Sequence, residues 1–280
     1  MSGRARPAGR WPLLTGGIIV GTFGFLGLLA PLIAPYDPHA ISGASLLSPS
    51  LHHLLGTNDL GQDVLSQLLF GARESLLVAL AASSLGTVVG VVLGAWAGLR
   101  GGAIDVVAMR TVDVALAMPA LPLLIVVAAL AGPNDLVVVL AVASVTWPPI
   151  ARIVRGQVLS LRSRGFVGAA RGFGGGSLYV TRRHVAPAAG PLIASQFVDV
   201  AGTAIVLYSG LAFLGLANAS TSSWGGILNR AATYPGIYDS LAWTWWLVPA
   251  GLSITLAVLG FALLGLGMEP GFNPRWARFS

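Results

Sequence analysis

Six long apolar stretches constrain the fold of this chain more than any other feature of its sequence. The hydrocarbon core of a bilayer is about 30 Å thick, so a helix that crosses it needs about 20 apolar residues. Apolar runs of roughly this length occupy residues 11–34, 75–99, 106–131, 136–151, 191–216 and 243–267. None alternates with the period of a barrel strand, so the sequence predicts an all-α membrane protein with six transmembrane helices.

Residues that break helices set the limits of these spans. Residues 132–135 (Gly-Pro-Asn-Asp) predict a tight turn between the third and fourth spans. Pro148 and Pro149 are expected to end the fourth span, which is short. The first apolar run is longer than the 7–15 residues or so of a signal-peptide core, so residues 11–34 are interpreted as an uncleaved span.

The composition excludes several classes of protein. Charged residues make up 9% of the 280 residues, against about 25% in a soluble domain, which is too few to cover a soluble globule. The absence of lysine excludes a Walker A phosphate loop, and the absence of cysteine excludes disulfides and thiolate metal sites. No Ser/His/Asp or HExxH arrangement is present, so we expect neither an enzyme nor a metal site, and His52-His53 is interpreted as part of a solvated loop.

The placement of arginine predicts the orientation. Thirteen of the sixteen arginines fall on one side of the predicted spans, and seven of these lie in residues 152–190 without any acid. The positive-inside rule places that side in the cytoplasm, together with both termini. The predicted order is a cytoplasmic N-terminus (1–10), a first transmembrane helix (11–34), an extracytoplasmic loop (35–74), a core of five helices (75–267) that includes the loop 152–190, and a cytoplasmic tail (268–280).

The second span carries four glycines at a spacing of four residues, Gly86, Gly90, Gly94 and Gly98. This spacing places them on one helix face, where a neighbouring backbone can approach closely. Two interpretations remain open, namely packing within the chain and a subunit interface or moving contact.

Few ionisable residues lie near the predicted bilayer. Arg110 and Asp113 are three residues apart and can pair on one helix face, and both are expected to snorkel or cap at the membrane edge. Asp199 lies deeper, in the fifth span, and is the stronger candidate for a transport pathway or an interhelix contact.

The basic loop 152–190 is too long for a simple turn between spans. Residues 161–173 are expected to form a short helix that the glycine cluster after it ends. Such a helix, held outside the membrane, could dock into a groove of a partner, and the alternative is a basic loop bound to anionic lipid headgroups.

Several motifs in this chain resemble those of ABC importer permeases. One match is to the E-A-A-x3-G signature and the proline that follows it. It is formed here by Gly168-Ala169-Ala170, Gly174 and Pro187, with Gly168 in place of the acid. PLIAPYDP at 31–38 and LLGTNDLGQDVLSQLLFGARESL at 54–76 are similar to the dipeptide/oligopeptide/nickel permeases, whose pattern is GTDxxGRDxxSRxxxGxRxSL. Asn58, Gln62 and Gln67 depart from that pattern, and Leu266 departs from an aspartate near its end. With LAFLGL and SWGGIL, the resemblance covers residues 31–267 and is to the "C"-type subunit.

The resemblance implies a type I importer fold and a role as half of a translocation path for di- and oligopeptides. It implies four kinds of partner: a second homologous permease, two ABC ATPases that bind ATP and Mg, an extracytoplasmic substrate-binding protein and membrane lipids. This chain would bind no cofactor and no nucleic acid, and would lie in the inner membrane of a bacterium. Nickel chelates, glutathione or another small solute are alternative substrates. An ion-gradient-driven secondary transporter is the alternative of another class, disfavoured because such carriers usually show inverted repeats and midplane acids.

Two contact surfaces follow from the resemblance. A coupling helix at about 165–176 would sit in a cleft of one ATPase, and because Gly168 lacks the acid, the arginines are expected to carry more of the docking. The residues assigned to coupling are Arg162, Arg164, Gly168, Ala169, Ala170, Arg171, Gly174 and Pro187. Trp224 and Tyr234, in the loop 218–242, are expected to contact the binding protein, and Trp243, Trp245 and Trp246 to form an interfacial aromatic belt.

Overall fold

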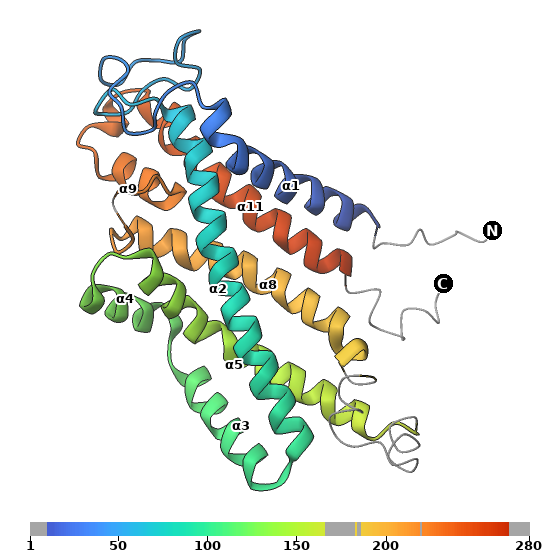
Figure 1. Cartoon of the computed structure of the whole chain (residues 1–280). Coiled ribbons are helices and arrows are strands. Elements are labelled where there is room, and N and C mark those ends of the chain that lie inside the picture. The colour runs from blue at the N-terminus through green and yellow to red at the C-terminus, as the bar shows by residue number, and fades with distance from the viewer. Residues whose placement is uncertain (1–9, 166–182, 184–185, 219, 269–280) are drawn as a thin grey trace, which may run out of the picture.

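A computed structural model describes residues 10–165, 183, 186–218 and 220–268 of the chain, and these are almost entirely helical (Figure 1). The only strand-like pairing within these ranges is a single bridge between Thr57 and Asp63. The elements are α1 (Arg10–Ile33), α2 (Val64–Arg100), α3 (Gly102–Ala117), α4 (Ala120–Ala131), α5 (Asp135–Arg162), α8 (Ala186–Phe213), α9 (Trp224–Thr233), the 3-10 turn η2 (Ile237–Asp239), α10 (Ala242–Trp245) and α11 (Leu247–Met268).

Five helical segments of this described part are long and apolar enough to cross a membrane, and the bent pair α3–α4 would make a sixth. The predicted all-α membrane fold is therefore confirmed. The prediction of a third span continuous over 106–131 is wrong, because α3 and α4 meet at an angle of 84°. Pro119 explains the break: a proline drives the residue before it out of the helical region, and Met118 is extended there.

The expected end of the fourth span at Pro148 and Pro149 is also wrong. Helix α5 passes through both prolines and continues to Arg162, so the first eleven residues of the predicted loop 152–190 are helical. Each proline removes a helical hydrogen bond, and one inside a helix costs about 3 kcal/mol. Pro148 is buried, and the long contact of α5 with α2 offsets that cost.

Helix α2 begins eleven residues earlier than the predicted second span, at Val64, so the predicted loop 35–74 ends at residue 63. Its 37 residues make it about 55 Å long, nearly twice the thickness of the hydrocarbon core. Between Glu74 and Arg100 it carries no charged residue, which matches the predicted span 75–99. The first turns of α2, with Arg73 and Glu74, therefore lie at or beyond the membrane edge.

Helices α2, α5, α8, α9 and α11 pack around one large core, in which the biggest fully buried side chains are Trp224, Trp246 and Tyr208. A smaller cluster lies between α5 and α8. Figure 1 shows segment 34–63 gathered at the top of the bundle, above the start of α2. We call this end of the molecule, formed by segment 34–63 and the residues around α9, the loop end.

Candidate functional site

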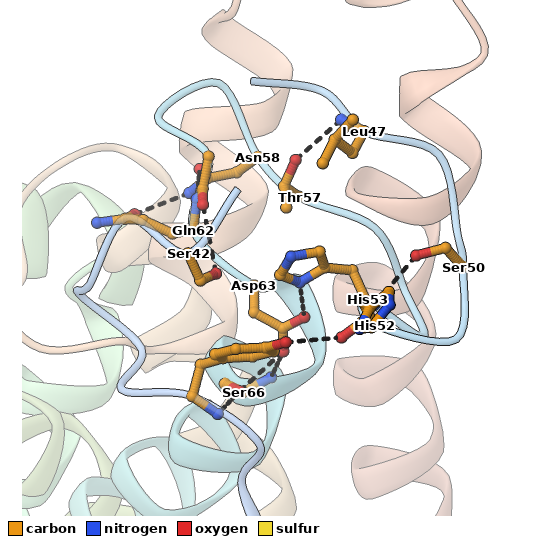
Figure 2. A network of polar contacts seen from close by, with 12 residues as sticks. Ser42, Leu47, Ser50, His52, His53, Thr57, Asn58, Gln62, Asp63 and Ser66 are labelled. Carbon is orange, nitrogen blue, oxygen red and sulfur yellow. Dashed lines mark hydrogen bonds and ion pairs between the residues drawn. The ribbon is translucent and has the colours of Figure 1, made fainter. Parts of the chain in front are cut away.

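Segment 34–63 lacks regular secondary structure apart from the Thr57–Asp63 bridge, and side-chain hydrogen bonds hold it in shape (Figure 2). The buried Thr57 hydroxyl donates to the carbonyl of Ala44 at 2.7 Å and accepts from the backbone N–H of Leu47 at 2.8 Å. Each bond ties together parts of the segment ten or more residues apart. The loop end is thus a built structure, onto which a larger partner or solute can dock without first ordering it.

His53 occupies the centre of this segment, contrary to the expectation that His52-His53 is solvated. Its side chain is only 6% exposed, and its Nδ1 lies 2.9 Å from Asp63 Oδ1. The other Asp63 oxygen accepts hydrogen bonds from the N–H and the hydroxyl of Ser66, so Asp63 also caps α2. Tyr36 stacks on the His53 ring with centroids 4.9 Å apart. The expectation was wrong for His53 and holds for the exposed His52.

The three amides that depart from the family pattern contact one another. The Asn58 amide donates to Gln62 Oε1 at 2.8 Å and to Gln67 Oε1 at 3.4 Å, and Gln67 donates to Gln62 at 2.8 Å. All three are nearly or fully buried. Gln62 and Gln67 also donate to the carbonyls of His39 and Pro38. The departures therefore form one neutral hydrogen-bonded group, which we call the amide triad.

Arg230 of α9 joins the distant C-terminal half of the chain to this group. Its Nε lies 3.0 Å from Asp59 Oδ1, and its Nη1 donates to Gln62 at 3.3 Å. Sequence reasoning missed this link, because Arg230 lies far along the chain from both partners.

Trp224 is fully buried, so the prediction that it forms part of an exposed docking surface is wrong. Its indole N–H donates to the carbonyl of Leu68, its backbone N–H donates to Ser75, and its ring fills the space left by Gly71. The predicted aromatic belt is wrong for Trp246, which is also fully buried. Tyr234 is half-buried beside the Trp246 ring, and its contact with a binding protein stays a prediction.

Two adjoining cavities open at the loop end, with volumes of about 270 and 310 Å³. His39, Thr221 and Ser222 line both of them, so the two cavities lie side by side, and we call them together the polar crevice. Its other polar lining residues are Gln67, Arg73, Glu74, Asn218, Asn229, Arg230 and the serines 220 and 223. A larger cavity of about 410 Å³ beside α3 is lined by no charged residue and suits a polar solute less well.

Two half-buried carboxyl groups meet beside the polar crevice. The Glu74 carboxyl lies within hydrogen-bonding reach of the Asp135 carboxyl. Asp135 also accepts from Asn218 Nδ2 at 3.1 Å and from the buried Tyr208 hydroxyl at 3.5 Å. Sequence reasoning missed this pair, although a signal existed: each acid directly precedes an apolar stretch, and both stretches begin on the same predicted side of the membrane.

The glycine face of α2 packs against α5 of the same chain. A Cβ on Gly86, Gly90, Gly94 or Gly98 would come within 3.0 Å of Thr146, Ile150, Ala151 or Val158, respectively. Of the two open interpretations, the structure therefore supports packing within the chain for this face.

At the end of the bundle opposite the loop end, ion pairs connect α3 to α5. Arg155 binds both oxygens of Asp105, with Nη2 to Oδ2 at 2.6 Å. Arg110 and Asp113 approach to 3.8 Å as predicted, but Asp113 also forms a closer pair with Arg152. Arg162 donates to the carbonyl of Gly98 near the end of α2 at 2.7 Å.

Most of the predicted coupling residues lie outside the described residues, namely Gly168, Ala169, Ala170, Arg171 and Gly174. Arg162 lies at the last turn of α5, Arg164 is exposed just beyond it, and Pro187 lies in the first turn of α8. Their role in coupling stays a prediction.

Asp199 lies on α8 with an exposed side chain, against α11. Its carboxyl group occupies the position that a Cβ on Gly265 would take, which supports the interhelix contact of the two predicted roles. Leu266, the other departure from the family pattern, is exposed on the same helix as Gly265.

Comparison with known proteins gives consistent matches. A family model described as "Binding-protein-dependent transport system inner membrane component" matches residues 90–278. A protein of Brucella suis provisionally named a peptide permease is 37% identical over 90% of this chain and 83% of its own length. The di/tripeptide transport system permease protein DppC of Pseudomonas aeruginosa is 35% identical over 90% of this chain and 84% of its own length. The nickel transport system permease protein NikC of Escherichia coli is 35% identical over 95% of both chains.

Proposed function

The chain belongs to the family of binding-protein-dependent transport system inner membrane components, and from that membership we propose that it forms half of the translocation path for small peptides in an ATP-driven importer. It is a multi-pass membrane subunit of an ABC importer and not itself an enzyme. The observation that carries the choice of peptides is the similarity, over 90% of the chain, to relatives named for peptide transport.

The energy for transport would come from partner subunits. A chain without lysine cannot build its own phosphate-binding loop, so ATP and Mg would be bound by two ATPases. Helix α5 leads directly into the predicted coupling segment, and its last basic side chain, Arg162, is hydrogen-bonded to the end of α2. A movement of the ATPases at residues 165–176 would therefore reach α2 and α5 together. A second homologous permease would complete the path.

The extracytoplasmic binding protein would deliver the peptide at the loop end. The positive-inside rule supports this orientation, because the segment 34–63 carries no arginine while the opposite side collects thirteen. The contacts that brace segment 34–63 against α2, α9 and Trp245 support it as a firm docking platform.

Uptake into proteoliposomes tests the proposed function. The chain is assembled with its second permease, the two ATPases and the binding protein encoded with them, and the import of labelled alanylalanine is measured with ATP present inside. ATP-dependent accumulation is expected, and it should vanish when the ATPase lysine of the phosphate loop is replaced. Import of a nickel chelate without any import of peptide would show that the substrate is a nickel chelate, the second candidate function, which the similarity to NikC favours. Accumulation driven by an ion gradient, without the ATPases, would identify a secondary transporter.

A further inference from the structure

We propose that the polar crevice is a contact site for the charged ends of the peptide, at which Glu74 and its partner Asp135 bind the terminal ammonium group and Arg73 binds the terminal carboxylate. The inference rests on the proposed function and adds to it a location and a chemical requirement.

The position of the crevice suits a solute that has left the binding protein and has not yet entered the membrane. Arg73 and Glu74 are the last charged residues of α2 before a run of 25 uncharged residues, so they mark its membrane edge. The two cavities measure about 270 and 310 Å³. Sites for small molecules range from about 300 to 1,000 Å³, so the crevice can hold a short peptide.

The two carboxyl groups of Glu74 and Asp135 favour the binding of a cationic group beside them. Two carboxyl groups in contact repel each other when both are ionised, unless a proton or a cation lies between or beside them. Asp135 receives hydrogen bonds from two neutral donors, Tyr208 and Asn218, and the positive charge close to Glu74 is that of its chain neighbour Arg73, whose side chain is exposed. An ammonium group, with three N–H donors, can take the place of that proton and donate to both carboxyl groups at once.

The neighbouring Arg73 supplies the opposite charge. It directly precedes Glu74 in the chain, its side chain is exposed, and it lines the same cavity. Its planar guanidinium matches the geometry of a carboxylate. A ligand that satisfies both residues must carry a positive and a negative group a short distance apart.

The rest of the lining combines Arg230 and apolar side chains such as Phe70 and Ile227 with neutral hydrogen-bonding groups. These groups are mainly the amides of Gln67, Asn218 and Asn229 and the hydroxyls of Thr221 and Ser222. Such groups can bind the N–H and C=O of a peptide bond whatever its side chains are. The crevice therefore fits short peptides with two free ends as a class.

Ligand binding by the intact membrane complex, without the binding protein, tests the site separately from transport. The two permeases and two ATPases are placed in nanodiscs, and saturation-transfer NMR measures the binding of alanylalanine, its N-acetyl form and its C-terminal amide. We expect the N-acetyl form to bind at least fivefold more weakly than alanylalanine. Glu74→Gln should abolish that difference, Arg73→Gln should abolish the difference between the free and amidated C-terminus, and Asp239→Asn, which removes an exposed carboxylate of the same end outside the crevice, should change neither.

Three results would overturn the site: equal binding of the free and N-acetylated peptides, no binding of either, or discrimination that survives Glu74→Gln. Glutamine keeps the shape of Glu74 and can still donate to Asp135, so the Glu74→Gln variant should fold. Co-purification of all four subunits verifies that the variant complex has assembled. A complex that imports alanylalanine in the uptake assay yet shows no discrimination here retains the proposed function and lacks the proposed site. A complex that imports no peptide fails at the proposed function itself.

Discussion

At the scale of single residues, the amide triad shows that departures from a family pattern can be coordinated. The pattern has an acid and two arginines where this chain has Asn58, Gln62 and Gln67, and the three amides contact one another. Replacing a buried set of charges by neutral groups of similar size removes their desolvation penalty while retaining hydrogen bonds. The neutral set therefore keeps the loop end in shape without buried charge.

The triad predicts a strong coupling between two substitutions. Gln67→Arg alone should destabilise the protein by about 3 kcal/mol, because it buries a charge without a partner, and Asn58→Asp alone should do the same. The double variant should recover most of that loss, since the introduced carboxylate and guanidinium can pair. Thermal unfolding of the wild type, the two single variants and the double variant in one detergent gives the coupling energy. Additive losses would show that the two positions do not interact.

The cap of α2 gives a second prediction. Asp63→Ala removes the acceptor for Ser66 and the partner of His53 together, so we expect a loss of about 2 kcal/mol, at the upper end for a helix cap. Asp37→Ala, which removes an exposed carboxylate that accepts one turn hydrogen bond, is the matched control and should change stability by less than about 0.5 kcal/mol. Equal effects of the two substitutions would contradict a special role for Asp63.

The residues that sequence reasoning misplaced share one physical cause. His53 and Trp224 are buried by partners that become neighbours only after folding, Asp63 in one case and Leu68 and Ser75 in the other. Local sequence shows that His53 follows another histidine and that Trp224 lies between two spans, and neither fact reveals burial. The contact between Glu74 and Asp135 was not predicted for the same reason, although both residues lie at the edges of predicted spans.

At the scale of elements, apolar length predicted the positions of the spans well, and the failures within the third and fourth spans were at prolines. The same residue type ended a helix at Met118–Pro119 and was accommodated at Pro148–Pro149. The difference lies in the neighbours: α5 packs along α2 over much of its length, whereas α3 and α4 have few buried residues. Such packing determines whether a helix continues through a proline at a cost of a few kcal/mol, and the periodicity of the sequence does not show it.

The contact between α2 and α5 predicts the effect of adding one methyl group. Gly94→Ala would push a Cβ into the backbone of Ala151, so we expect a loss of at least about 2 kcal/mol. Gly156→Ala, on α5 with nothing within 4 Å, should be neutral or stabilising by up to about 1 kcal/mol, because alanine favours helices over glycine. Unfolding midpoints of the two variants provide the comparison, and a neutral Gly94→Ala would mean that the helices can separate without loss.

The coupling segment gives a prediction that depends on the arginines of the loop. Arg171→Glu reverses a charge in the segment expected to dock on the ATPase, so peptide uptake should fall at least about tenfold while the chain still inserts and pairs with the second permease. Arg278→Glu, a reversal in the tail, should leave uptake near the wild-type rate. An Arg171→Glu complex that assembles and transports normally would show that this arginine does not contribute to docking.

At the scale of the whole molecule, the absence of cysteine permits a direct test of orientation. A single cysteine at Leu51, which is 96% exposed in the loop end, should react with a membrane-impermeant maleimide in intact cells. A single cysteine at Ser163, just beyond α5, should react only after the membrane is opened. Reaction of the second variant in intact cells, with none at Leu51, would invert the proposed topology.

The unbroken α2 helix has a mechanical consequence. A stiff rod about 55 Å long that tilts by about 10° about its middle displaces each tip by about 5 Å, roughly half the diameter of a helix with its side chains. Residues 64–74 at its outer tip include Ser66, which donates to the cap, Gln67 of the amide triad, and Arg73 and Glu74, which line the crevice. Its inner tip is hydrogen-bonded to Arg162 beside the coupling segment. A tilt too small to unpack the core could thus open or shut the outer vestibule in the same stroke that moves the inner end.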